Sequence, residues 1–316
     1  MQSATKPIDN RTEQEMHSCE ACSSSRLRQL ANLNGARIIK CLNCNLVYLD
    51  GRDPKPQADY YDEVLLDDYI KYYKDHRTDI FSKHLRIIEN YSAKGKILDI
   101  GCSFGWFLDL AQKAGWVGFG LENSQKAIGY AREKYGLSVS PGGIEAIKNF
   151  DTDFQVITLW NVLEHIPNPL RKLEMINEKL SSDGLLVISV PNIEGLITKL
   201  AFLSYRLSGG KFKFALSRLY QIENENPHLY HFSLKTITSI LNKSGYKIVA
   251  VFKENIIDAK NISSRLVIDS GIKDRNVIYK SLLAWGIKFI FYLSKFLRME
   301  DEIIVYSKKN KVFSSR

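Results

Sequence analysis

A glycine-bracketed turn in residues 97–111, ILDIGCSFGWFLDLA, joins an apolar strand pattern to a helical pattern and carries an acidic residue. Asp99 lies two residues before Gly101, and the glycines follow Gly-x-x-x-Gly, Gly101 and Gly105, rather than Gly-x-Gly-x-x-Gly. Turns that hold phosphate use backbone N–H groups to meet negative charge, and a neighbouring carboxylate would oppose that binding. The turn therefore favours a ligand that carries positive charge.

A second carboxylate, Glu122, ends the next predicted strand, VGFGLEN, about 20 residues after Gly101. An acidic side chain at this position can accept hydrogen bonds from both hydroxyls of a ribose. A nicotinamide dinucleotide would need its pyrophosphate at the turn, where Asp99 is unfavourable. S-adenosylmethionine combines a ribose with an α-ammonium group and a sulfonium, so it fits both carboxylates.

Histidines at two places in the chain are candidates for catalysis: His165, next to Glu164, and the pair His228 and His231 in NPHLYHFS. Methyl transfer from a sulfonium is an in-line displacement, so holding the two reactants together supplies most of the acceleration. A base is needed only where the nucleophile must lose a proton. Two alternatives remain open: structural, hydrogen-bonded histidines, or a divalent metal held by Glu164, His165 and one of the later histidines.

Four cysteines form two C-x-x-C pairs, Cys19 with Cys22 and Cys41 with Cys44, separated by residues 23–40. Each pair, held in a tight turn, can supply two of the four ligands of a tetrahedral zinc ion. Four thiolates leave no open position for a substrate, so the predicted zinc is structural. The alternative is two disulfides or four unligated thiols, and a reducing cytoplasm disfavours the disulfides.

The chain also resembles the class I S-adenosylmethionine-dependent methyltransferases, through the glycine turn, the motif LWNVLEHIPNP at 159–169 and the following LLVISVPN. The likeness extends over residues 95–250. It implies that the Asp99–Gly105 turn, including Cys102, holds the methionine part of the cofactor and that Glu122 binds the ribose. Asn161, at the end of a predicted strand, either contacts the cofactor or caps the next turn. Family members often have Gly-Cys-Gly-x-Gly at the turn, whereas this chain has Ser103 in the middle.

Short buried strands alternate with helical patterns from residue 96 onward, which predicts an α/β fold: a Rossmann-like sheet with helices on both faces. We expect three parts. Residues 1–50 form a polar N-terminus and a small zinc-ribbon-like module, residues 51–94 a helical lead-in, and residues 95–316 the methyltransferase domain. Two insertions decorate that domain, at about 193–227 and 255–300.

The second insertion contains an amphipathic helical pattern with Lys280, Lys288, Lys295 and Arg298 on one face and a broad apolar arc. Such a helix lies either on a membrane surface or on the protein's own core. The N-terminus has no apolar signal-like segment, and no stretch is apolar enough to span a bilayer, so we expect a cytoplasmic protein, with peripheral contact to the inner membrane face as one reading.

A net charge of +9 permits anionic partners without choosing among them. The motifs predict an enzyme that transfers a methyl group to a small-molecule, glycan or lipid-linked acceptor. Apolar and basic segments near the site suit an amphiphilic acceptor such as a quinone precursor. The alternatives are an RNA methyltransferase and a non-catalytic zinc-ribbon protein that binds nucleic acid, although the cofactor motifs make nucleic acid the less favoured partner.

Overall fold

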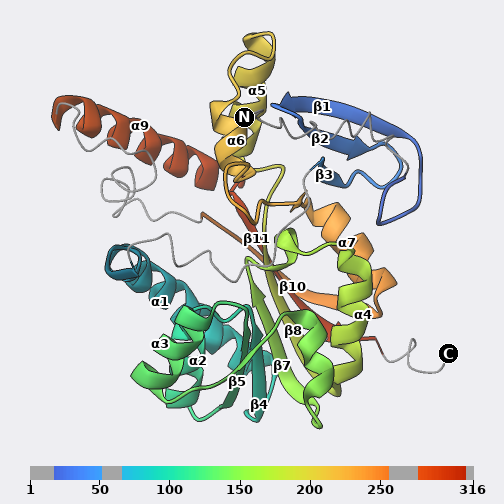
Figure 1. Cartoon of the computed structure of the whole chain (residues 1–316), viewed down its shortest axis with the longest axis vertical. Coiled ribbons are helices and arrows are strands. Elements are labelled where there is room, and N and C mark those ends of the chain that lie inside the picture. Colours follow the sequence, from blue (N-terminus) through green and yellow to red (C-terminus); the bar gives the residue numbers. More distant parts are fainter. Residues whose placement is uncertain (1–17, 52–65, 256–276, 311–316) are drawn as a thin grey trace, which may run out of the picture.

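A seven-stranded sheet forms the centre of the computed structural model, which describes residues 18–51, 66–255 and 277–310 (Figure 1). The strands lie in the order β10-β11-β8-β7-β4-β5-β6. Their bounds are Lys96–Ile100 for β4, Val117–Glu122 for β5, Ser138–Pro141 for β6, Phe154–Trp160 for β7, Leu180–Pro191 for β8, Tyr246–Glu254 for β10 and Glu302–Lys309 for β11. β11 is antiparallel to both of its neighbours, and the pairings from β8 through β6 are parallel.

Helices cover both faces of this sheet, as the alternation of patterns predicts. One face carries α1 (Leu66–Tyr91), α2 (Trp106–Lys113) and α3 (Gln125–Tyr135), and the other carries α4 (Pro169–Lys179) and α7 (Leu234–Lys243) (Figure 1). The central strands β4 and β7 are almost wholly buried because both of their faces are covered. The predicted Rossmann-like α/β fold is confirmed.

The N-terminal cysteines lie at one end of a separate small sheet with the order β1-β2-β3-β9, with Cys41 as the last residue of β2. It consists of β1 (Leu27–Leu33), β2 (Ala36–Cys41), β3 (Val47–Asp50) and β9 (Tyr230–His231), and all of its pairings are antiparallel. The last strand, β9, comes from within the predicted methyltransferase domain, residues 95–316. The small module is therefore completed by a segment that the sequence placed in the other domain.

The first predicted insertion folds as α5 (Leu196–Leu207) and α6 (Phe214–Leu219), which pack on the small sheet. Phe202 of α5 and Tyr220, just after α6, share a buried cluster with Leu33 and Ile38 of that sheet. Burying each large apolar side chain stabilises the contact by about 2 kcal/mol. The first insertion thus joins the cysteine module to the main sheet.

The second predicted insertion contributes α9 (Val277–Phe296), which leads into β11. Residues 256–276 of this insertion, the segment 1–17 of the predicted N-terminus and residues 52–65 of the lead-in lie outside the described residues. Among the described helices, none combines the length and apolar character needed to cross a bilayer. Figure 1 shows α5, α6 and α9 at the same end of the molecule as the small sheet.

Candidate active site

The glycine turn between β4 and α2 has the left-handed backbone that its sequence predicts. The φ angles of Gly101, Ser103 and Gly105 are 69°, 50° and 76°. A Cβ at Gly101 would lie 2.5 Å from Cγ2 of Val162, so the turn is also packed too closely for a side chain there. Ser103, at the position where family members often have glycine, also adopts a positive φ, which glycine reaches with less strain.

Asp99 is buried near the end of β4, with 3% of its surface exposed. Thr158 of the adjacent strand β7 donates a hydrogen bond to its Oδ1 atom at 2.7 Å. Burial raises the pKa of Asp99 to about 8; the Thr158 hydrogen bond opposes this effect and the nearby charge of Glu122 adds to it. A positively charged ligand at this edge would restore the ionised carboxylate.

Glu122, at the end of β5, accepts three backbone hydrogen bonds. Its Oε2 atom accepts from the N–H of Ser103 at 2.8 Å, and its Oε1 atom accepts from Asn123 at 2.8 Å and Ser124 at 3.0 Å. Burial raises the pKa of Glu122, and these backbone bonds partly offset that rise. The Ser103 contact ties the carboxylate directly to the glycine turn.

These features fit S-adenosylmethionine in two respects. The turn has three positive-φ positions that glycine adopts without strain, and two buried carboxylates lie at the ends of adjacent parallel strands. The side chain of Cys102 is buried against Gly120, where an added Cβ would lie 2.6 Å from Sγ. Its side chain thus helps to pack the turn on β5.

Asn161 directly follows β7 and has a φ of 57°. Its side chain hydrogen-bonds to residues that are distant in sequence. Its Oδ1 atom accepts a hydrogen bond from Arg77 of α1 at 2.8 Å, and its Nδ2 atom donates to Glu302 of β11 at 2.9 Å. Ser189 of β8 also donates to Glu302. Asn161 therefore links α1 to the sheet at the strand end where the predicted site lies.

His165 shares the short 3-10 helix Leu163–His165 with Glu164, His228 lies on the segment before β9, and His231 lies in β9 itself. Ring centroids lie 4.7 Å apart for His165 and His228, and 5.6 Å apart for His228 and His231. Val162, whose side chain crowds Gly101, precedes this helix directly and places the group next to the glycine turn.

His165 has a defined tautomer because its Nδ1 atom lies 3.1 Å from the carbonyl oxygen of Pro227. A carbonyl only accepts, so Nδ1 must donate and Nε2 keeps its lone pair. Burial lowers the pKa of His165 to about 4, which keeps the ring neutral at pH 7. Burial likewise lowers the pKa of His231 to about 4, and that ring stacks on Tyr220 with centroids 4.2 Å apart.

Glu164 is fully buried, and neither of its carboxylate oxygens has a hydrogen-bond partner among the described residues. Burial raises its pKa to about 8. Ligand atoms of Glu164, His165 and His228 all lie within 4.8 Å of one another, so the metal alternative considered from the sequence is geometrically open for one later histidine, His228. No described contact places His231 in this group of ligand atoms.

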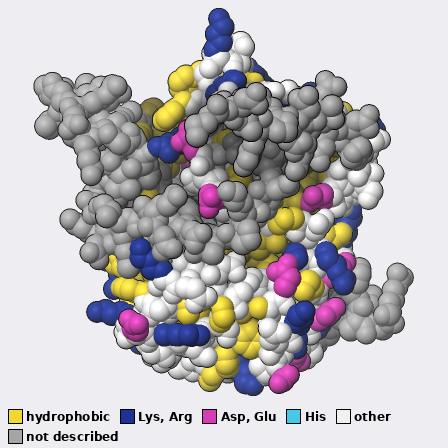
Figure 2. All heavy atoms as spheres, in the orientation of Figure 1, with side chains coloured by type: hydrophobic (Ala, Val, Ile, Leu, Met, Phe, Trp, Pro, Cys, Tyr) yellow, Lys and Arg dark blue, Asp and Glu magenta, His cyan; other side chains and the backbone are white. Residues whose placement is uncertain are grey.

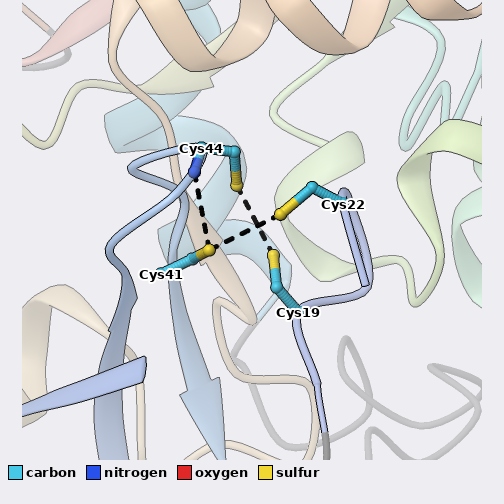
Figure 3. Close-up of side chains that lie close together, drawn as sticks. All are labelled: Cys19, Cys22, Cys41 and Cys44. Atoms are coloured by element: carbon cyan, nitrogen blue, oxygen red, sulfur yellow. Dashed lines mark hydrogen bonds between the residues drawn. The ribbon is translucent and has the colours of Figure 1, made fainter. Parts of the chain in front are cut away.

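The four N-terminal cysteines converge from two loops, as Figure 3 shows. Cys19 Sγ lies 3.5 Å from Cys44 Sγ, and Cys22 Sγ lies 3.6 Å from Cys41 Sγ. Four sulfurs about 2.3 Å from a tetrahedral zinc ion would be about 3.8 Å apart, close to these separations. None of the four is in a disulfide. The donor set and its spacing therefore fit zinc.

Hydrogen bonds from the first C-x-x-C loop connect the cysteine module to the main domain. Glu20 accepts hydrogen bonds from the hydroxyl of Tyr230 and, at 3.2 Å, from the backbone N–H of Asn168. Lys243 of α7 donates to the carbonyl of Ala21 at 3.0 Å. The loop that would hold the metal thus contacts β9, which carries His231, and the segment that follows the His165 helix.

Comparison with known proteins assigns the family. Residues 72–251 match a family described as a methyltransferase domain, and this match spans more than half of the chain. The chain therefore belongs to the methyltransferase-domain family. The family match confirms the methyltransferase resemblance that the sequence motifs indicated.

The curated relatives share only part of their length with this chain. It is 32% identical over 107 residues to a ubiquinone biosynthesis O-methyltransferase from Actinobacillus pleuropneumoniae, covering 31% of this chain and 46% of the relative. It is also 32% identical over 120 residues to the mitochondrial ubiquinone biosynthesis O-methyltransferase of Schizosaccharomyces pombe, covering 36% and 43%. The chain thus spans less than half the length of either relative.

A chain in the solved complex between the Haloferax volcanii Trm112 methyltransferase activator and the putative methyltransferase has a similar fold. The TM-score is 0.53 at 13% identity, and the match covers 80% of this chain and 97% of that one. At this identity the likeness supports the fold alone, in agreement with the strand order described above.

Proposed function

We propose that this chain is a methyltransferase that uses S-adenosylmethionine and modifies an amphiphilic small molecule, with quinone precursors as the first class to test. The observation that carries the cofactor is the pair of buried carboxylates, Asp99 and Glu122, on either side of the glycine turn. When bound, S-adenosylmethionine supplies an electrophilic methyl group on its sulfonium. Asp99 would pair with the ammonium group and Glu122 with the ribose hydroxyls.

Support for a small-molecule acceptor comes from the relatives named ubiquinone biosynthesis O-methyltransferases. Those names describe the relatives themselves, and the matches cover under half of each. Exposed apolar side chains on α5 and α9, next to the edge where β8 ends, add support from this chain itself. A glycan or lipid-linked acceptor belongs to the same proposal.

His165 is the residue that we propose as the base, because donation from its Nδ1 atom to the Pro227 carbonyl leaves the Nε2 atom of the neutral ring unprotonated. A pKa of about 4 makes the ring a weak base but keeps it unprotonated at neutral pH. His228 would orient His165 through ring contact, and His231 would support β9 through its stack on Tyr220. Glu164, His165 and His228 could instead hold a divalent cation.

The proposed zinc is structural and belongs to the module formed by Cys19, Cys22, Cys41 and Cys44. Four unpaired thiols suit a reducing compartment, so the proposal includes a cytoplasmic location with peripheral contact to the inner membrane face. RNA is the second candidate acceptor, favoured by the run of basic residues on and around α5 and α6, Lys199, Arg206, Lys211, Lys213 and Arg218.

The test of this proposal is transfer of labelled methyl groups from S-adenosylmethionine to polyprenylated phenols and to total RNA, with and without a chelator and added Mg²⁺. The proposal predicts label in the phenols, and loss of about a hundredfold in rate for His165→Gln, as is typical of removing a positioned base. Label in RNA alone would overturn the small-molecule proposal. A rate that follows added Mg²⁺ would favour the metal over the base.

A further inference from the structure

The described part of α9 carries a stripe of exposed aromatic side chains. Trp285, Phe289, Tyr292 and Phe296 are 75%, 67%, 69% and 83% exposed. At 100° per residue they fall within an arc of about 60° on one side of the helix. The opposite side holds the buried Phe291 and Ser294, so the outward stripe is not the face by which α9 packs on the protein.

A second exposed apolar stripe lies on α5. Leu200, Leu203 and Leu207 are 40%, 50% and 80% exposed and recur at helical spacing, while Phe202 packs inward on the small sheet. Two further exposed aromatic residues follow: Phe212 at 49%, just before α6, and Phe214 at 61%, the first residue of α6. Exposed apolar residues clustered in this way mark interaction sites more often than ordinary surface.

The start of α5 and the end of α9 lie at the same place in the fold. The N–H of Leu196, at the start of α5, donates to the carbonyl of Met299, just after α9, at 2.8 Å. The N–H of Ile197 donates to the Oδ1 atom of Asp301 at 3.2 Å. These helix ends lie next to Pro191, where β8 ends. Asp99 and Glu122 lie near the ends of β4 and β5, at the same edge of the sheet.

Positive charge accompanies both stripes. Lys288 and Lys295 lie along one side of the aromatic arc of α9, and Lys199 and Arg206 lie along one side of the leucines of α5. Neither segment 195–222 nor segment 277–299 contains an aspartate or a glutamate. Figure 2 shows basic and hydrophobic side chains next to one another on the projecting end of the molecule that carries α5 and α6.

We propose that the exposed faces of α5 and α9 together form a docking surface for an anionic lipid bilayer. Aromatic side chains prefer the interfacial region of a bilayer, and lysine and arginine side chains beside them meet anionic headgroups. The absence of acidic residues from both segments matches a negatively charged surface. A second copy of this chain would bring the same positive charges together and is disfavoured by their repulsion.

Docking in this way would place the edge of the sheet with Asp99 and Glu122 beside the lipid. An acceptor dissolved in the membrane could then enter without crossing bulk water. The docking proposal stands on α5 and α9 alone, and its test uses neither cofactor nor acceptor.

The experiment is vesicle flotation of the full chain with phosphatidylcholine vesicles and with vesicles containing phosphatidylglycerol, at low and high salt. Wild type should float with the anionic vesicles at low salt and less at high salt. Phe289→Ser with Phe296→Ser should weaken binding about tenfold or more, because two large side chains no longer enter the interface. Lys288→Glu with Lys295→Glu should weaken it at least about fivefold per charge.

The matched control is Lys134→Glu with Lys247→Glu, the same charge change at exposed positions on α3 and β10, which should float like wild type. Thermal denaturation and sedimentation of each variant show that it is folded and report its oligomeric state. Absence of flotation by folded wild type at low salt would overturn the proposal. So would equal flotation of all variants, or a concentration-dependent dimer that the Phe289→Ser with Phe296→Ser variant loses without any vesicle binding.

Discussion

The hydroxyl of Tyr230 in β9 donates a hydrogen bond to the carboxylate of Glu20, which lies between the first two cysteines of the N-terminal cluster. Burial and the nearby Glu20 charge raise the pKa of Tyr230, so its phenol stays protonated and remains a donor. This bond connects the proposed zinc loop with the strand that carries His231. Metal binding at the cysteines should therefore influence the order of β9, although the two lie about two hundred residues apart in sequence.

Loss of one cysteine ligand tests this connection. Cys41→Ser should reduce the metal content from about one zinc per chain and lower the midpoint of thermal unfolding, because a structural zinc site contributes directly to folding. Amide hydrogen exchange across residues 228–232 should increase, while the affinity for S-adenosylhomocysteine changes little. Metal analysis and exchange mass spectrometry provide the measurements.

Cys102→Ser is the control for metal content, since Cys102 lies outside the cysteine cluster and should leave the zinc in place. Purified wild type that is free of zinc and no less stable for it would contradict the structural role. Unchanged exchange in residues 228–232 after zinc loss would contradict the link through Tyr230.

The crowding of the glycine turn gives a second prediction. In Gly105→Ala the new Cβ would lie 2.4 Å from Cδ1 of Leu137, and φ is already 76°. We expect a loss of about 2–4 kcal/mol in the free energy of unfolding, from backbone strain and overpacking together. Urea denaturation measures it.

Gly136→Ala is the matched comparison, because Gly136 has a φ of 64° but a Cβ added there would meet no heavy atom within 4 Å. Its cost should be confined to the backbone, about 1–2 kcal/mol. Equal losses for the two variants would mean that packing at Gly105 does not constrain the turn.

The raised pKa of Asp99 predicts a pH dependence. Because burial moves this pKa from 3.8 to about 8, the ligand-free protein holds a proton on Asp99 that the unfolded chain has lost. The contribution of Asp99 to stability therefore falls as the pH rises through this window. A ligand ammonium favours the ionised carboxylate, so binding must release that proton below pH 8.

The affinity for S-adenosylhomocysteine should accordingly rise by up to about tenfold per pH unit between about pH 6 and pH 8. Asp99→Asn should bind more weakly and lose this slope, since asparagine has no proton to release. Calorimetry in buffers of different ionisation enthalpy measures the released proton. A wild-type affinity that does not change with pH would show that Asp99 is already ionised or does not meet the ligand.

Much of this arrangement could be predicted from the sequence because it depends on local spacing. Alternating patterns define the α/β sheet, and the positions of Asp99 and Glu122 relative to the glycines define their strand ends. The C-x-x-C pairs likewise define a converging cluster, since each pair needs only its own turn.

The residues that sequence reasoning missed act through contacts between distant segments. Arg77 and Glu302 reach Asn161 from α1 and β11, and neither position has a local pattern that distinguishes it from an ordinary charged residue. Thr158 offered a weak signal, as a polar residue in the mainly apolar strand β7, where it pairs directly with Asp99. The pairing of β3 with β9 depends on tertiary packing. Because β9 is only two residues long, it has no alternating pattern from which a strand could be predicted.

The site assigned to the cofactor rests most directly on one calorimetric comparison: binding of S-adenosylhomocysteine to wild type, Asp99→Ala and Glu122→Ala at neutral pH. We predict saturable binding of about one ligand per chain to wild type and a loss of about 1.5–3 kcal/mol in each variant, the range for hydrogen bonds to charged groups. Equal binding by all three folded proteins, or no binding by wild type, would contradict the assignment.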